Sequence, residues 1–194
     1  MLSSRRVRTA LQLVGALALL TWAPPASHLD GQEQAPLVLG LPASTEAMGL
    51  GNVFPVSGRD ADAVFYNPAA LAVARGMGVA GQRYGSGSTL LTGSAALPWL
   101  GGGVGLGIQS LAYDAASDTA APTLSDLVND GGTAVAEMAA SLGYAREVGP
   151  LSLGVVAKLL EQRLGSARAS AWAADLGATA EVAFLTLGLA IQNV

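Results

Sequence analysis

The chain contains no cysteine and only one histidine, His28, among its 194 residues. Without these side chains, disulfides, Cys nucleophiles, Ser-His-Asp triads and His or Cys metal sites are excluded from the chain beyond His28. The Gly/Ser-rich run at residues 85–89 lacks the lysine of a phosphate-binding loop, and no G-x-S-x-G turn occurs. The sequence therefore predicts no metal site and no cofactor, and we interpret the protein as a non-enzyme.

Charge and aromatic side chains are also scarce. Charged residues make up 12% of the chain and aromatic residues 5%, whereas an average globular domain has about 25% charged residues. No charged residue lies between Tyr84 and Tyr113, yet the many glycines of this stretch and Pro98 argue against membrane-spanning helices. The net charge of −4 excludes electrostatic attraction to nucleic acid.

The first 34 residues have the pattern of a signal peptide. Arg5, Arg6 and Arg8 precede an apolar run over 10–20, which a Pro- and Ala-rich stretch follows. We predict cleavage between Ala23 and Ala35. A retained N-terminal anchor is the alternative, although the apolar run is short for a membrane span.

From residue 76 onward, apolar side chains alternate with small or polar ones. Such a two-residue period indicates β-strands. It predicts seven strands over residues 76–84, 89–97, 103–112, 133–147, 151–164, 171–181 and 184–193. Tight turns are expected at 98–101, 148–150 and 182–183, with longer loops at 85–88, 114–132 and 165–170. The loop 114–132 carries four Asp and no base, which indicates a solvated acidic loop or, alternatively, a cation site.

The lengths and faces of these strands favour a transmembrane β-barrel over a soluble β-sandwich. Strands of about ten residues span a bilayer when tilted. One face is apolar throughout and is expected to point toward lipid: Val104, Leu106, Ile108, Leu142, Leu153, Val155, Leu187 and Leu189. The other face is small or polar and carries the charges of Glu137, Lys158, Asp175 and Glu181. These lumen-lining charges would either border a permeation path or form interior salt bridges.

Aromatic residues near the expected strand ends match the girdles of a membrane barrel. These are Trp99, Tyr113, Tyr144 and Trp172, with ordinary core packing as the alternative. Seven is an odd number of strands, whereas bacterial single-chain barrels close with an even number. We therefore expect residues 76–194 to form part of a larger barrel, or an oligomer to complete one.

The segment 35–75 has a different pattern, without alternation. Asn67 followed by Pro68 and Ala69 predicts a helix start, with Asn as the N-cap and Pro at the first helical position. The stretch 42–49 predicts another short helix that ends at glycine. Asp60 and Asp62 are expected to bind local backbone donors and so fix the loop.

The run from Leu41 to Ala72 resembles the N-terminal segment of the PorV/PorQ group within the FadL-like family of outer-membrane barrels. Asp60-Ala61-Asp62-Ala63 matches the acidic turn of that segment, and Tyr66-Asn67-Pro68-Ala69 matches its aromatic-Asn-Pro-Ala motif. Ala70 stands where glycine is common, and Pro55 interrupts the usual apolar run. In the family this segment is a hatch folded inside a barrel of about 14 strands.

The resemblance implies an all-β, antiparallel outer-membrane barrel, of which the chain holds about seven strands, with a short helical hatch. It implies binding or transport of hydrophobic small molecules past that hatch. The alternative is a PorV-like barrel that does not transport but holds secreted proteins for a type IX secretion system. A soluble periplasmic β-protein is a third possibility. The expected partners are outer-membrane lipid, hydrophobic small molecules or secreted proteins.

Overall fold

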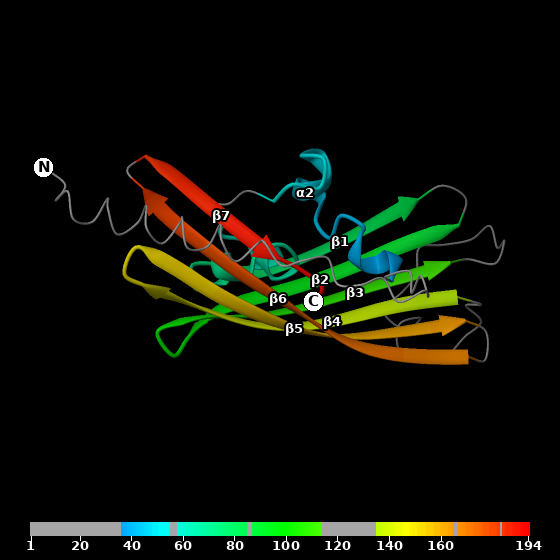
Figure 1. Ribbon diagram of the computed structural model, residues 1–194. Coiled ribbons are helices and arrows are strands. Elements are labelled where there is room, and N and C mark those ends of the chain that lie inside the picture. The colour runs from blue at the N-terminus through cyan, green and yellow to red at the C-terminus, as the bar shows by residue number, and fades with distance from the viewer. Residues whose placement is uncertain (1–35, 55–57, 85–86, 114–134, 165–166, 183) are drawn as a thin grey trace, which may run out of the picture.

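The computed structural model describes residues 36–54, 58–84, 87–113, 135–164, 167–182 and 184–194. These residues form one antiparallel sheet of seven strands in the order β1-β2-β3-β4-β5-β6-β7 (Figure 1). The strands are β1 (Gly76–Tyr84), β2 (Ser88–Trp99), β3 (Gly102–Tyr113), β4 (Val135–Val148), β5 (Leu151–Leu164), β6 (Ala167–Val182) and β7 (Leu185–Ile191). Each strand pairs with the next along the chain, so the sheet is a meander that curls into half of a barrel.

All seven predicted strands are confirmed, and β1 and β5 have the predicted bounds. The predicted loop at 165–170 is wrong in length, because β6 begins at Ala167 and pairs with β5 from Leu164 onward. The turn between β2 and β3 is shorter than expected, since Trp99 is still in β2. The predicted signal peptide and the acidic loop lie outside the described residues, Asp114 included.

Local backbone geometry accounts for the turn between β2 and β3. Leu100 and Gly101 are its two loop residues, and both have positive φ, 48° and 73°. Two positive φ angles define the type I′ turn, whose twist matches that of the flanking strands. The register that follows places Leu97 opposite Val104 and Ala95 opposite Leu106, so the apolar side chains of the two strands share one face.

The two faces of the sheet differ as the alternation predicts. The convex face carries exposed apolar side chains, among them Leu106 (55% exposed), Leu142 (56%) and Trp172 (76%). The other predicted outward residues are exposed as well, except Val104, which is half-buried. On the concave face the side chains are buried or half-buried over most of β2 to β5.

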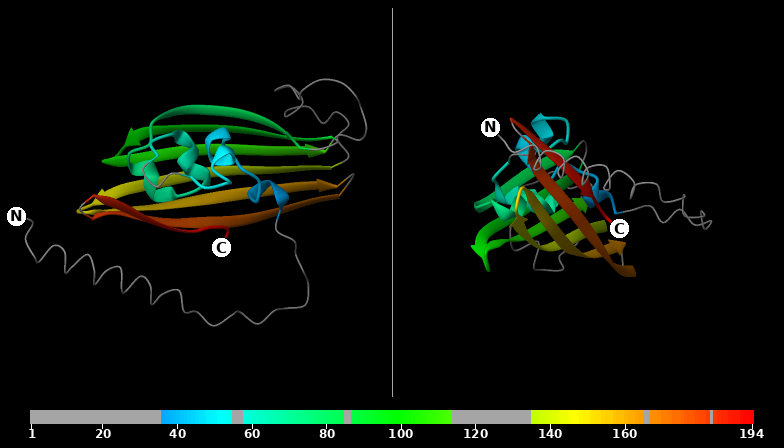
Figure 2. Two further views of the ribbon diagram at one scale, coloured as in Figure 1. Left: turned by 90° about the horizontal axis from the view of Figure 1, so that it is seen from above. Right: turned by 60° about the vertical axis from the view of Figure 1, so that its left-hand side comes forward.

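The described residues of the segment 35–75, namely 36–54 and 58–75, lie against the concave face (Figure 2), and we call this segment the hatch. It contains η1 (Leu37–Leu39), α2 (Thr45–Gly49), η2 (Ala61–Phe65) and η3 (Pro68–Ala72). Ser44 caps α2 by accepting a hydrogen bond from the backbone N–H of Ala47, which confirms the short helix predicted at 42–49. Among the described residues, no helix is both long enough and apolar enough to cross a membrane.

Two apolar clusters join the hatch to the sheet. One is built mainly from η2 and η3 and includes the fully buried Leu71 and Val64 together with Val156 of β5. The other surrounds Val38 of η1 and includes inward-facing side chains of β2 to β5: Leu90, Leu111, Ala139 and Leu160. Tyr113 packs against this second cluster, so its assignment to an outer aromatic girdle is wrong.

Candidate functional site

The Asn-Pro-Ala motif forms the start of η3. The side-chain oxygen of Asn67 accepts a hydrogen bond of 3.0 Å from the backbone N–H of Ala69, while Asn67 itself stays in an extended conformation. Pro68 occupies the first turn, where its fixed φ favours the helix and its missing N–H costs nothing. The predicted N-cap is therefore confirmed, although the helix it begins is a 3-10 helix.

A track of glycines on the concave face receives η2 and η3. A Cβ atom at any of these positions would overlap or crowd an atom of the hatch. The track comprises Gly103, Gly105 and Gly107 of β3, Gly143 of β4, Gly154 of β5 and Gly177 of β6. Gly105 pairs directly with Gly143, and Gly154 with Gly177, so the track crosses from strand to strand. Because glycine lacks a side chain, the hatch backbone approaches the sheet backbone closely here.

The Asn-Pro-Ala motif lies at the β5–β6 end of this track. A Cβ atom on Gly154 would overlap the backbone of Pro68, and one on Gly177 would overlap the side-chain oxygen of Asn67. Leu71, one turn further on, fills the space above Gly105 and Gly143. The motif thus caps η3 and also packs closely against the concave face of the sheet.

Polar side chains of the sheet hold the first part of the hatch. Gln82 donates to the carbonyl of Pro42 over 2.8 Å, and Thr92 donates to the carbonyl of Ala43 over 2.7 Å. Gln109 donates to the carbonyl of Val38 over 3.2 Å. These donors come from β1, β2 and β3, so three strands satisfy backbone carbonyls that the short hatch helices leave without partners.

Glu137 of β4 also binds the first part of the hatch. Its carboxylate accepts a 2.8 Å hydrogen bond from the backbone N–H of Val38 and a weaker one, over 3.4 Å, from Gln162. Val38 is therefore bound through both backbone groups, because Gln109 binds its carbonyl. The structure places Glu137 on the concave face, as predicted, and gives it a role in holding the hatch.

Tyr66 joins the two parts of the hatch. Its hydroxyl accepts from the backbone N–H of Ala43 over 2.7 Å and donates to the side chain of Asn52 over 3.4 Å. Its ring stacks on Phe54, with centroids 5.1 Å apart and planes 6° from parallel. Burial raises the pKa of the Tyr66 hydroxyl, against the opposing effect of the Ala43 and Ser44 N–H donors. The hydroxyl therefore keeps its proton at neutral pH.

Asp62 binds the sheet instead of local backbone donors, so that part of the expectation is wrong. Its carboxylate accepts a short hydrogen bond from the hydroxyl of Ser94 in β2 and lies directly above Gly78 of β1. Asp60 makes no side-chain cap to η2; its backbone pairs with Arg75 in an isolated bridge. Burial raises the pKa of the Asp62 carboxyl, the Ser94 hydrogen bond lowers it, and the nearby charge of Asp60 raises it further.

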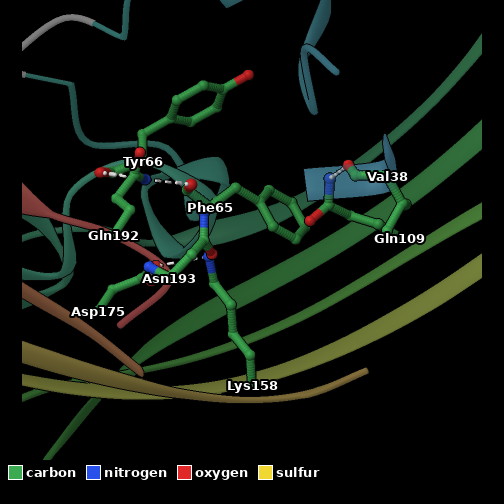
Figure 3. A network of polar contacts seen from close by, with 8 residues as sticks. All are labelled: Val38, Phe65, Tyr66, Gln109, Lys158, Asp175, Gln192 and Asn193. Carbon is green, nitrogen blue, oxygen red and sulfur yellow. Dashed lines mark hydrogen bonds and ion pairs between the residues drawn. The ribbon is translucent and has the colours of Figure 1, made fainter. Parts of the chain in front are cut away.

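Two of the four predicted lumen charges form a buried ion pair (Figure 3). The ammonium of Lys158 lies 2.7 Å from a carboxylate oxygen of Asp175, and the two side chains are 3% and 0% exposed. Asn193 completes the pair, since its side-chain oxygen accepts from Lys158 over 2.9 Å and its N–H donates to Asp175 over 2.8 Å. Between these two residues the structure favours the salt-bridge interpretation over the permeation path.

Glu181, the fourth predicted charge, is exposed at the rim of the sheet. It borders a hollow of about 270 Å³ between η3 and the ends of β5, β6 and β7. Arg59, Glu147, Ser152 and Thr179 line the same hollow. Its lining is mixed in charge, so it offers no apolar site. Among the described residues, no group of three or more acidic or histidine side chains gathers as a metal site would require.

Several residues that hold the hatch are not among the predicted site residues. Tyr66, Gln82, Thr92 and Gln109 each bind a hatch group distant in sequence. Gln192 joins them, donating to the carbonyls of Phe65 and Tyr66 over 2.9 Å each. The alternation assigns Gln82, Thr92, Gln109 and Gln192 to the inner face, and a polar residue there is the signal that could have identified them.

Searches of protein-family models, curated proteins and solved structures find no match to this chain. The resemblance to the FadL-like family therefore rests on the residues from Leu41 to Ala72 alone.

Proposed function

We propose that the protein is an exported outer-membrane β-barrel that binds or transports hydrophobic small molecules past a hatch. In this proposal residues 1–34 direct export, residues 35–75 are the hatch, and the seven strands belong to a barrel of about 14. The observation that carries the proposal is the division of the sheet. Exposed apolar side chains cover its convex face, and the hatch lies on its concave face.

The convex face supports the membrane part of the proposal. Its exposed Leu, Ile, Val and Met side chains extend over all seven strands, from Met77 in β1 to Ile191 in β7. An apolar surface of this extent is unfavourable in water and favourable against acyl chains. Strands of 12 to 16 residues, as in β2 to β6, exceed the length needed to cross a bilayer when tilted.

The hatch contacts support the gating part of the proposal. The hatch contacts the sheet through side-chain donors, a glycine track and single polar contacts, and no disulfide fixes it to the sheet. Each such hydrogen bond contributes about 1 kcal/mol net, so a few of them can break and reform on a functional timescale. Movement of η2 and η3 away from the track would open the inner side of β3 to β6.

A reversible cross-link tests this function, since the chain has no cysteine of its own. Asp62→Cys with Ser94→Cys replaces two side chains that are in contact across the hatch and the wall. We expect the oxidised full-length protein in proteoliposomes to stop accumulating a fluorescent fatty acid, and reduction to restore uptake. Each single-cysteine variant is the control for the substitution itself. Equal uptake in the oxidised and reduced double variant would contradict gating by the hatch.

The close fit of the hatch favours a second candidate function. Backbone atoms of Pro68, Ala69 and Leu71 lie where Cβ atoms of a non-glycine wall would be, and Asn67 caps η3 against the same wall. A hatch seated this closely would suit a permanently plugged barrel of the PorV type, which holds secreted proteins at the surface. In that case the oxidised double variant would retain its cargo proteins on intact cells, and no hydrophobic probe would pass in either redox state.

A further inference from the structure

The last strand departs from regular pairing where it meets the hatch. Leu176 pairs with Ile191, and the next paired residues are Ala174 and Val194, whose backbone groups exchange hydrogen bonds of 2.9 and 3.1 Å. Two residues, Gln192 and Asn193, therefore stand opposite Asp175 alone. Asn193 has a positive φ of 59°. This two-against-one arrangement is a β-bulge, a feature that redirects side chains from their regular alternation.

The bulge lets two consecutive residues act on the inner side of the sheet. In a regular strand Gln192 and Asn193 would point to opposite faces. Here Gln192 donates to the carbonyls of Phe65 and Tyr66, while Asn193 reaches the inward-facing ammonium of Lys158 (Figure 3). The two carbonyls lie at the end of η2, immediately before Asn67.

The buried ion pair fixes the position of the bulge. Lys158 and Asp175 lie on the adjacent strands β5 and β6 and are almost fully buried. Buried charges require further hydrogen bonds to offset their loss of hydration. Asn193 provides one to each charge, through its side-chain oxygen and its backbone N–H. Displacement of the bulge would therefore remove one partner from both buried charges.

We propose that the Gln192–Asn193 bulge is a latch that holds the η2–η3 junction of the hatch against the wall, with the Lys158–Asp175 pair as its anchor. Gln192 is the positioning residue for the hatch, and Asn193 couples Gln192 to the anchor. This inference rests on the proposed function in that it names one of the contacts that must break for the hatch to move. It separates the hatch into a part held at 38–44 by β1 to β4 and a part held at 65–66 by β7.

The test uses single cysteines as accessibility probes in the full-length protein in detergent. Ala63→Cys reports on η2 and Ala43→Cys on the first part of the hatch; both positions are buried, at 0% and 2% exposure. Gln192→Leu removes both hydrogen bonds to η2. We expect maleimide labelling of residue 63 to accelerate about tenfold, because two hydrogen bonds to the end of η2 are lost. Labelling of residue 43 should stay the same.

Gln162→Leu is the matched control, because Gln162 is also an interior glutamine but binds Glu137 of the wall. It should leave residue 63 protected. Asn193→Gly is the second latch variant, since glycine keeps the positive φ and the backbone N–H while removing the contact to Lys158. It should also accelerate labelling of residue 63, by less than Gln192→Leu does.

Unchanged labelling of residue 63 in a folded Gln192→Leu protein would overturn the latch. So would loss of heat-modifiable gel mobility in both latch variants, since the residues would then hold the wall itself. Accelerated labelling without any change in uptake of a fluorescent fatty acid would support the latch and count against gated transport. The experiment therefore distinguishes a failure of the latch proposal from a failure of the gated-transport proposal.

Discussion

The hatch is held to the sheet in two different ways along its length. From residue 38 to 44, side chains of Gln82, Thr92, Gln109 and Glu137 reach out from the sheet and bind hatch backbone groups. From residue 64 to 72, the hatch lies mainly on a glycine track, and Gln192 adds side-chain hydrogen bonds to the carbonyls of Phe65 and Tyr66. The first part is bound by side chains of the sheet, and the second part fits mainly where the sheet has glycine and no side chains.

This difference predicts different tolerance to substitution. A donor in the first part is one of several, and its loss leaves one hatch carbonyl without a partner. Gly103 and Gly154 in the second part have no spare space above them, because backbone atoms of Leu71 and Pro68 lie there and cannot move aside as a flexible side chain can. The anchor below the second part, Lys158 with Asp175, should be the least tolerant of all because it holds buried charge.

The largest effect is expected from Lys158→Met, which leaves the Asp175 carboxylate buried without its cation. Such a broken pair costs about 3–5 kcal/mol of folding free energy. Denaturant unfolding of the full-length protein, followed by gel mobility, measures this change. The double variant Lys158→Met with Asp175→Leu should recover most of the loss, because no uncompensated charge remains. A double variant as unstable as Lys158→Met would show that the pair itself is stabilising.

Gly154→Ala should come next. Its new methyl group would overlap the backbone of Pro68, so either η3 must leave its seat or β5 must bend. Overpacking of this kind costs about 1–3 kcal/mol. Protease protection of the hatch and denaturant unfolding both report on it. Gly81→Ala is the matched control, since its Cβ would meet only Leu91 at 3.9 Å. Equal tolerance at Gly154 and Gly81 would contradict the role of the track.

The sequence predicts the faces of the strands well, because alternation is a local property of each strand. Leu106, Leu142 and Leu153 point outward as expected, and the cap by Asn67 follows from adjacent residues alone. The partners of inner-face residues are not local. Asp62 binds Ser94, and Gln192 binds Phe65 across 127 positions, and neither contact leaves a periodic trace in the chain.

The inward-facing leucines show the same limit. Leu90 and Leu111 are among the most buried side chains, yet they lie on the face that was expected to be small or polar. They are buried because they form one apolar cluster with Val38 of η1. An alternation pattern identifies the two faces of a strand. Which inner positions can hold a buried apolar side chain depends on where the hatch packs against that face. Tyr113, two residues after Leu111 in β3, packs against the same cluster.

Thr92→Val tests the first part of the hatch at one donor. The substitution keeps the shape of the side chain and leaves the carbonyl of Ala43 without its 2.7 Å partner. An unsatisfied buried acceptor costs about 1–3 kcal/mol, and here the loss should lie at the lower end because Gln82 and Gln109 still bind the carbonyls of Pro42 and Val38. Labelling of Ala43→Cys should accelerate while labelling of Ala63→Cys stays slow. Equal acceleration at both probes would show that the hatch moves as one unit.

Asn67→Ala should cost about 1 kcal/mol, the usual value of an N-cap. The loss falls on η3, so the amide hydrogens of residues 69–72 should exchange faster while barrel folding stays normal. Asn67→Asp is the control, because Asp also caps and its oxygen can accept from Ala69. If the hatch gates transport, uptake of the hydrophobic tracer should change in Asn67→Ala and not in Asn67→Asp. Lost folding in Asn67→Ala would instead make the motif a requirement for the fold.

The smallest effect is expected from pH, acting through Asp62. Burial against β1 and β2 raises the pKa of this carboxyl, and the charge of Asp60 adds to the rise. Because the pKa of Asp62 is raised when the hatch is packed on the sheet, Asp62 binds a proton more readily in that state than when the hatch has moved away. The packing of the hatch on the sheet is therefore most stable below the ordinary pKa of 3.8, and it loses stability as the pH rises through the raised pKa of Asp62.

Hydrogen exchange over 61–65, corrected for intrinsic rates, should thus show stronger protection at about pH 4 than at about pH 7. Asp62→Asn should remove this dependence, because an amide neither titrates nor repels Asp60, while its oxygen can still accept from Ser94. Tyr66 does not interfere, since its own raised pKa lies above this window. A pH dependence that persists in Asp62→Asn would assign it to another group. Greater protection at the higher pH would mean that the ionised carboxylate is the favoured partner of Ser94, so that this hydrogen bond outweighs burial.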